Sequence, residues 1–221
     1  MSVVDIILRY RTAFADGLRV TLFLASIAWA IGLLGGAVLG TLATRFPKLV
    51  GYPLRVISFA LAAIPPIVLL YWAHYPLQAT MQVVVDPFIT AAATLSVLNT
   101  AVVAEITRSA LLSFRREYKV AAYVSGMTRG ETLRFIELPL IFRQALPALL
   151  ASQVLVLQST LFASLISVEE LFRVAQRINA TIYRPIQIYT ALALFFLFVC
   201  GPVYLFAYVL RQRLVRDYSE S

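Results

Sequence analysis

The sequence has few of the charged side chains with which a soluble protein covers its surface. Only 14% of its 221 residues are charged and 61% are hydrophobic, whereas a soluble domain has about 25% charged residues. Nine glycines and ten prolines are too few for a collagen-like or proline-rich disordered chain. A single cysteine, Cys200, excludes a disulfide scaffold. This composition, with a mean hydropathy of +0.83, is that of an integral membrane protein.

Histidine and lysine are almost as scarce as cysteine, and this excludes several kinds of site. One histidine, His74, and one cysteine cannot form a zinc site of the usual ligands. Neither Lys48 nor Lys119 follows a glycine, so the chain has no G-x-x-x-x-G-K-[ST] loop to hold ATP phosphates. The hydrolase motifs G-x-S-x-G and H-E-x-x-H are absent as well. We therefore predict that the chain is not an enzyme and has no catalytic residue, metal site or cofactor.

Long uncharged apolar runs are what the sequence has in abundance. A helix of about 18–20 apolar residues crosses the hydrocarbon core of a membrane. Runs of this length occupy residues 20–44, 56–73, 87–104, 144–168 and 186–210. We predict an all-α integral membrane protein, a single domain over residues 1–221, with five transmembrane helices at about 18–44, 55–75, 87–113, 142–168 and 186–211. Residues 2–17, which carry four charges, are predicted to form a short surface helix rather than a secretory signal.

The net charge of +8 is distributed unevenly between the segments that connect these runs. With five spans, residues 45–55, 105–143 and the C-terminal tail lie on one side of the membrane and hold thirteen of the 19 basic residues. The cytoplasmic side of membrane proteins is enriched in Lys and Arg. We therefore predict a cytoplasmic C-terminus and an N-terminus outside, although Arg9 and Arg11 favour the opposite orientation modestly.

Small residues and prolines within the spans predict how the helices pack. Gly32, Gly36 and Gly40 recur every four residues, which leaves one helix edge bare for the close approach of a neighbour. Pro65 and Pro66 must interrupt the hydrogen bonding of the second span. Such a break is tolerated at membrane depth where it faces protein or a water-filled cavity. It is also compatible with an ordinary kink of no functional importance.

Polar side chains within the spans are the candidates for a path through the membrane. They are Tyr71, Asn99, Ser152, Gln153, Ser159 and Thr160. Hydrogen bonding between neighbouring helices needs the same residue types, so it remains an equal alternative. Glu105, at the cytoplasmic end of the third span, is expected to pair with Arg108 or another arginine rather than to bind substrate.

The loop over residues 115–139 is too polar to span and has the signals of two helices. The first is expected over 117–125 and ends at Gly126, a residue typical of helix C-termini. Thr128 and Glu131 match a capping box that begins a second helix, and Pro139 is expected to stop it. DNA binding is disfavoured because membrane spans tether the loop at both ends. We predict a docking element for a cytoplasmic partner.

Motif spacing in this loop resembles a known family. Val120-Ala121-Ala122, Gly126 and Ile136-Glu137-Leu138-Pro139 keep every spacing of the EAA loop of binding-protein-dependent ABC importers, E-A-A, three residues, G, nine residues, I-x-L-P. Ala104-Glu105-Ile106-x-Arg108 and Gln158-Ser159-Thr160-Leu161 resemble segments of the polar amino-acid permeases within that family. The likeness extends over residues 17–211. One departure is Val120, which stands where the motif has an acidic residue.

The resemblance implies a type I ABC importer permease fold in which the loop is a cytoplasmic coupling helix. The coupling residues implied are Glu117, Val120, Ala121, Ala122, Gly126, Ile136, Leu138 and Pro139. The implied partners are a second permease subunit in a homo- or heterodimer, two ATP-binding cassette subunits, an extracytoplasmic solute-binding protein and membrane lipid, with no nucleic acid. The implied location is the bacterial cytoplasmic (inner) membrane, as a multi-pass protein. The implied activity is ATP-driven import of polar amino acids or related small solutes by alternating access.

Two further features bear on the substrate and on the outer surface. Relatives often have Asn-Glu where this chain has Ala151-Ser152, and the lost carboxylate argues against a fixed site for a cationic amino acid. Residues 169–180 form an amphipathic helix whose polar face has Glu169, Arg173 and Arg177 at a spacing of four. The segment is either an interfacial helix whose charged residues pair with one another or, as the family implies, an outer gate and docking surface for the solute-binding protein.

Two other classes of function remain alternatives at this stage. A stand-alone secondary transporter or channel would place charged residues in the middle of its spans, and Glu105 is near a helix end. A membrane scaffold or assembly factor leaves the spacing of the EAA motif unexplained. Co-purification of an ATPase would discriminate both from an importer.

Overall fold

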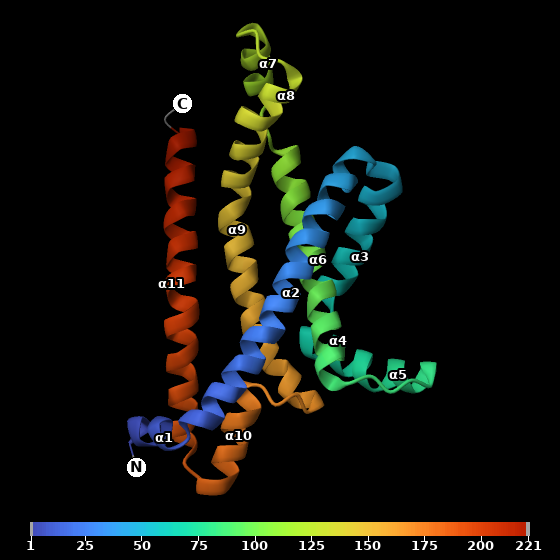
Figure 1. Cartoon of the computed structure of the whole chain (residues 1–221). Coiled ribbons are helices and arrows are strands. Elements are labelled where there is room, and N and C mark those ends of the chain that lie inside the picture. The colour runs from blue at the N-terminus through green and yellow to red at the C-terminus, as the bar shows by residue number, and fades with distance from the viewer. Residues whose placement is uncertain (1, 220–221) are drawn as a thin grey trace.

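The structure, a computed structural model, describes residues 2–219, and these residues form helices joined by short connections (Figure 1). The α-helices are α1 (Val3–Arg9), α2 (Arg11–Arg45), α3 (Tyr52–Ala63), α4 (Pro66–His74), α5 (Pro76–Met81), α6 (Pro87–Leu112), α7 (Arg116–Val124), α8 (Arg129–Thr132), α9 (Leu138–Ser159), α10 (Leu171–Ile182) and α11 (Pro185–Ser219). Two π-helical turns, η1 (Pro47–Gly51) and η2 (Leu133–Glu137), and a 3₁₀ segment, η3 (Thr160–Ile166), complete the chain. The predicted all-α class is confirmed over the described residues.

Four helical segments are long and apolar enough to cross a membrane. They are Arg11–Arg45, Pro87–Leu112, Arg129–Ile166 and Pro185–Arg213. A fifth span is formed if the pair Pro47–Ala63 and Pro66–Met81, bent by 97° relative to each other, is counted as one broken span. The bend falls where the sequence predicts an interruption. Ile64, which precedes two prolines, has an extended backbone with ψ of 125°, because the ring of a following proline disfavours helical geometry.

The two long helices α2 and α6 pack closely along the glycine edge predicted from the sequence. A β-carbon at position 36 would lie 2.5 Å from Cβ of Val103, and one at position 40 would lie 2.5 Å from the backbone oxygen of Ala104. Such distances leave no room for any side chain. The glycines therefore permit the backbones to approach, as small residues do in membrane helix pairs.

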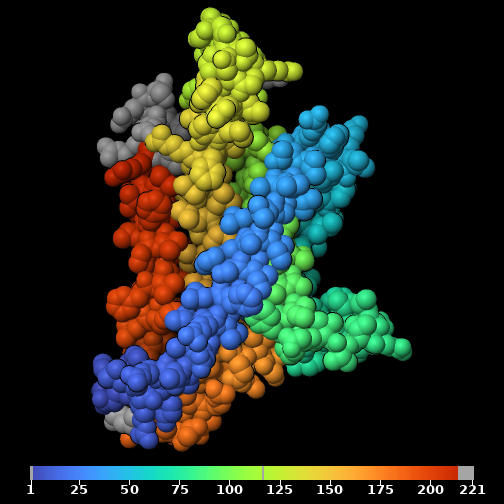
Figure 2. Space-filling view, viewed as in Figure 1, coloured from blue at the N-terminus to red at the C-terminus, as the bar shows by residue number. Residues whose placement is uncertain are grey.

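The two ends of the bundle carry different elements. Helices α7 and α8 project at one end, and α1 and α10 lie at the other, with α11 running along the bundle between them (Figure 1). Figure 2 shows α7 and α8 standing out beyond the bundle. A buried cluster joins the α1 end to α10 and α11 through Ile6, Val174, Ala175, Ile178 and Ile188.

The prediction of one surface helix over residues 2–17 is wrong in its extent. α1 ends at Arg9, Tyr10 has non-helical dihedral angles, and α2 begins at Arg11 and continues into the first span. Ile6 is 0% exposed. Ile6 therefore packs into the bundle, while Val4, Ile7 and Leu8 of the same helix are exposed.

Candidate coupling loop and polar cluster

The first helix of the loop, α7, ends as the sequence predicts. Gly126 has φ of +80°, the left-handed conformation that favours glycine. Its N–H donates to the Tyr123 oxygen, and the Met127 N–H donates to the Ala122 oxygen, both at 3.0 Å. A β-carbon at position 126 would meet no atom within 4 Å. Glycine is therefore required there for its backbone conformation rather than for space.

The predicted capping box is present at the start of α8. The Glu131 N–H donates to Thr128 Oγ1 at 3.3 Å, and the Thr128 N–H donates to Glu131 Oε2 at 2.8 Å. These reciprocal bonds fix the turn between α7 and α8.

The predicted stop before Pro139 is wrong. Residues Arg129–Ile166 form one continuous helical segment, in which η2 leads directly into α9. The Leu138 N–H donates to the Leu133 oxygen across the wide turn, and Pro139 takes the second position of α9. Within this continuous segment Pro139 donates no backbone N–H to the preceding turn, and it follows directly on the wide π turn η2. The loop is thus joined rigidly to the span that follows it.

The candidate coupling residues differ in their exposure to solvent. Val120 is 60% exposed and Ala122 only 3% exposed, so Ala122 packs within the loop. Ile136 is half-buried, and the remaining candidates Glu117, Ala121, Gly126, Leu138 and Pro139 are exposed. Tyr123 and Val124 extend the exposed apolar surface of α7. An apolar surface of this kind at the tip of a projecting element is typical of a partner-binding site.

An ion pair inside the loop was missed by the sequence analysis. The Lys119 Nζ atom lies 2.8 Å from Glu137 Oε2 and 5.6 Å from the centre of the Phe114 ring. Lys119 and Glu137 are 18 positions apart and lie in different helical elements, α7 and η2, so a spacing rule for one helix could not reveal the pair.

Three of the six candidate path residues form one polar cluster between α2, α6 and α9. Asn99 Nδ2 donates to the Ala28 oxygen at 3.0 Å and to Gln153 Oε1 at 2.9 Å. Gln153 Nε2 donates back to Asn99 Oδ1 at 3.3 Å and to Ser152 Oγ at 3.0 Å. Trp29 Nε1, which the sequence did not single out, donates to the Gln153 backbone oxygen at 3.0 Å. The arrangement is interhelical hydrogen bonding, the alternative considered for these residues.

The other three candidates lie outside this cluster's hydrogen bonds. Ser159 and the buried Thr160 donate to backbone oxygens of their own helical segment, those of Leu155 and Leu157. Tyr71 stacks on Tyr75 with ring centres 5.7 Å apart. The predicted pair near the end of α6 is present, with Arg108 Nε donating to Glu105 Oε2 at 2.9 Å.

At the opposite end of the bundle, α10 has the predicted amphipathic character. Its apolar residues are buried, and Glu169 on the outer side pairs with Arg173 at 3.8 Å and with Arg177 at 3.1 Å. Glu170, 0% exposed, caps the helix by accepting the N–H groups of Phe172 and Arg173. Burial raises the pKa of this carboxyl to about 7, although the two N–H groups favour its ionised form.

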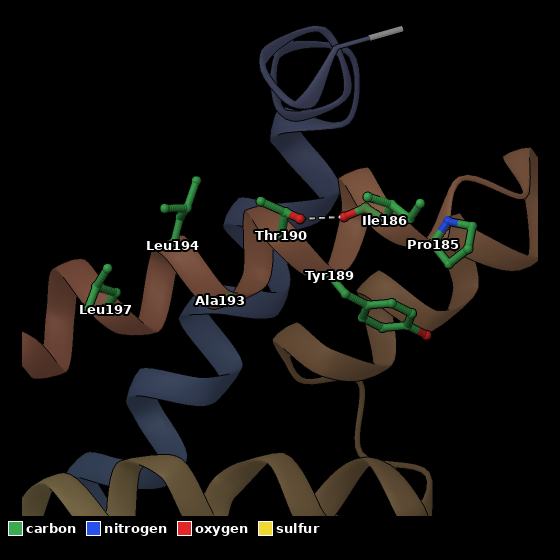
Figure 3. A pocket seen from close by; sticks show the side chains of 7 residues that line it. All are labelled: Pro185, Ile186, Tyr189, Thr190, Ala193, Leu194 and Leu197. Carbon is green, nitrogen blue, oxygen red and sulfur yellow. Dashed lines mark hydrogen bonds between the residues drawn. The ribbon is translucent and has the colours of Figure 1, made fainter.

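A shallow apolar groove follows one face of α11 (Figure 3). It is lined by Pro185, Ile186, Tyr189, Thr190, Ala193, Leu194 and Leu197. The Thr190 hydroxyl is already bonded to the Ile186 oxygen of the same helix. All the described residues that line the groove belong to α11, so it lacks the convergent polar groups of a small-molecule site.

A bundle of long apolar helices with one broken span, and with a short helix projecting at one end, is the architecture of a multi-pass membrane protein. Residues 20–216 match the family model of the binding-protein-dependent transport system inner membrane component, and the chain belongs to this family.

Individual relatives agree with this assignment. The chain is 31% identical over 189 residues to the glutamine transport system permease protein GlnP of Escherichia coli (strain K12), covering 83% of this chain and 84% of the relative. It is 33% identical over 207 residues to the L-cystine transport system permease protein TcyB of Bacillus subtilis (strain 168), covering 91% and 86%.

Two solved structures share the fold. A crystal structure of an amino acid ABC transporter with histidines matches with a TM-score of 0.81 and 23% identity, covering 94% of this chain and 96% of that chain. An inward-facing structure of the MetNI methionine ABC transporter matches with a TM-score of 0.70 and 17% identity, covering 92% and 97%. These two structures show the fold, while the family match and the relatives identify the chain as a permease subunit of an ABC importer in the inner membrane, with ATP hydrolysed by a separate subunit and with ATPase and binding-protein partners.

Proposed function

We propose that this permease imports polar amino acids or related small solutes by alternating access. Similarity to permeases named for glutamine and L-cystine supports this substrate class. The observation that carries the proposal is the position of α7 at the tip of the bundle. This short helix has an exposed apolar face, and its residues keep the spacing of the EAA motif. In the assembly, two such permease subunits, identical or different, bind two ATP-binding cassette subunits and receive solute from an extracytoplasmic binding protein.

Coupling uses α7 as the element that the ATPase moves. Val120 and Ala121 lie in a groove of the ATPase, with Glu117 at the start of the same helix. Gly126 reverses the chain beneath the groove, while Ile136, Leu138 and Pro139 connect the loop to α9. Because α8, η2 and α9 form one continuous helical segment, displacement of the loop is transmitted to Ser152 and Gln153 within the membrane.

The substrate passes through the polar region of the bundle. In the observed arrangement, Asn99 and Gln153 satisfy each other's amide groups, so passage requires these helices to separate or rearrange. The cluster holds no carboxylate, which favours a solute without a cationic side chain or a second subunit that supplies the specific contacts. Tyr71, Ser159 and Thr160 remain proposed contributors along the path.

The opposite end of the bundle receives the binding protein. Glu169, Arg173 and Arg177 offer charges of both signs on the exposed side of α10, where a folded solute carrier can dock or operate an outer gate. This assignment places the N-terminus outside and the C-terminus in the cytoplasm, in agreement with the distribution of basic residues.

A purification and transport experiment tests the proposed function. The chain, tagged and purified from its own membrane, should retain an ATP-binding cassette protein. Cells that express it should take up radiolabelled L-glutamine, L-cystine or another polar amino acid only while ATP is available. Transport by the purified chain alone in vesicles, without an ATPase, would instead establish the secondary transporter.

A further inference from the structure

Helix α7 has two faces that meet different surroundings. Val120, Ala121 and Val124 are exposed, whereas Ala122 is buried and Lys119 is half-buried. Residues three apart in a helix lie on the same side, so Lys119 and Ala122 form the face turned toward α8 and η2, against which α7 packs. A displacement of α7 by a partner on its exposed face is transmitted to the rest of the subunit through this inner face. On it Ala122 has only a methyl group, whereas the longer Lys119 side chain can contact residues outside α7.

Lys119 contacts the segments on both sides of the loop. Its amine lies 2.8 Å from Glu137, the last residue before α9. It also lies 5.6 Å from the ring centre of Phe114, which follows the end of α6 at Leu112. The Phe114 ring is held in turn against Tyr118, with ring centres 5.9 Å apart. One side chain therefore joins α7 to the chain that leaves one membrane span and to the chain that enters the next. Figure 1 shows α7 at the end of the bundle where α6 ends and α9 begins.

The acidic partner is well placed to respond to movement of α7. The Glu137 side chain is only 15% exposed, so little solvent can replace its ion pair with Lys119 when α7 moves. Glu137 also closes the π turn η2. Turns of this type within helices are frequent at functional positions. In the I-x-L-P motif, Glu137 occupies the unspecified position, to which the motif assigns no role.

We propose that Lys119 is a positioning residue that couples α7 to α6 and α9 together, through its ion pair with Glu137 and its contact with the Phe114 ring. This inference rests on the proposed function. The Lys119–Glu137 ion pair gives the loop a charged contact that orders it. The motif's own acidic position cannot do so, because it is occupied by the apolar Val120. Without Lys119, α7 still binds the ATPase by its outer face, but its displacement reaches the membrane helices incompletely.

The test compares variants in the intact complex, purified from its own membrane through a tag on this chain. Lys119→Met keeps the length of the side chain and removes its charge, and Glu137→Gln removes the partner charge. Both should retain the ATPase and its basal hydrolysis but lower ATP-dependent amino-acid uptake per ATPase by at least about fivefold, the low end of coupling between linked sites. Lys119→Arg and the exchanged pair Lys119→Glu with Glu137→Lys should restore most of the uptake.

Arg134→Met is the matched control, since it removes one positive charge from the same loop at a residue whose guanidinium lies over the neighbouring Phe135 ring. Uptake by Lys119→Met equal to that of Arg134→Met would overturn the positioning role. An exchanged pair no better than either single variant would do the same, and loss of the ATPase from Lys119→Met would move Lys119 to the docking surface. If the unmodified chain retains no ATPase, the proposed function itself fails, an outcome distinct from all of these.

Discussion

Gly32 lies directly against the Asn99 side chain, so that a β-carbon at position 32 would sit 2.5 Å from Asn99 Cγ. The missing side chain at Gly32 in α2 thus leaves room for the buried amide of Asn99 in α6. Replacement of Gly32 by alanine should destabilise the protein by about 1–3 kcal/mol, the usual cost of overpacking a well-filled site. Thermal unfolding in detergent measures the effect.

Gly35 supplies the control for this substitution. A β-carbon at position 35 would meet Thr100 Cγ2 at 3.4 Å, close to ordinary contact. Gly35→Ala should therefore be neutral or slightly stabilising, because alanine is the better helix former. Equal unfolding temperatures for Gly32→Ala and Gly35→Ala would contradict the close packing of α2 on Asn99.

The Asn99–Gln153 pair should behave as a coupled unit. A double-mutant cycle with Asn99→Ala and Gln153→Ala is expected to give an interaction energy of about 0.6–1.7 kcal/mol, the range found for interhelical hydrogen bonds in membranes. Reversible unfolding in mixed micelles provides the four free energies. Ser159→Ala is the reference, since its hydroxyl is bonded within its own helix, and it should show no coupling to Asn99→Ala.

The left-handed backbone at Gly126 makes that residue irreplaceable in the coupling loop. Gly126→Val places a β-branched residue at φ of +80°, which costs about 1–2 kcal/mol locally and disrupts the turn. Transport should fall severely while insertion into the membrane is unchanged, as judged by uptake and by the amount of protein in the membrane fraction. Gly130→Val, in the helical turn of α8, should retain most of the transport; equal losses in both variants would dismiss the turn as the cause.

Glu170 should make stability depend on pH. Its pKa is raised from 4.5 to about 7 in the folded protein, so the folded state binds a proton more tightly than the unfolded state. The resulting stabilisation is complete below about pH 4.5 and is lost as the pH rises through 7, by about 3 kcal/mol. Unfolding followed from pH 4.5 to 8 should show this loss in the unmodified chain and a flatter profile in Glu170→Gln. Stability profiles that fall in parallel with pH in both proteins would show that Glu170 is not the group responsible.

Local patterns in the sequence predicted those features that depend on neighbouring residues. The capping box at Thr128, the turn at Gly126 and the buried face of α10 are each defined within a few positions, and the structure confirms them. Pro139 was misjudged because a π turn, which sequence rules rarely anticipate, brings the proline into a tolerated position.

Contacts between distant segments could not be predicted in this way. The bond from Trp29 to the Gln153 oxygen spans 124 positions, and the Lys119–Glu137 pair joins α7 to η2. Both depend on how helices are placed in space, and no periodic signal records that placement. The polar character of Asn99 and Gln153 identified them as important, but only the structure shows that they satisfy each other.

Site-directed cross-linking at Val124 tests the central claim, that α7 docks on an ATPase, most directly. Val124 is 83% exposed on α7, whereas Val84, 100% exposed, lies in the connection before α6, at the opposite end of that span. In a Cys200→Ala background, Val124→Cys carrying a photoactivatable label should form an adduct with an ATP-binding cassette protein in native membranes, and Val84→Cys should not. No ATPase adduct at Val124, or equal adducts at both positions, would contradict the role of α7 as the coupling helix.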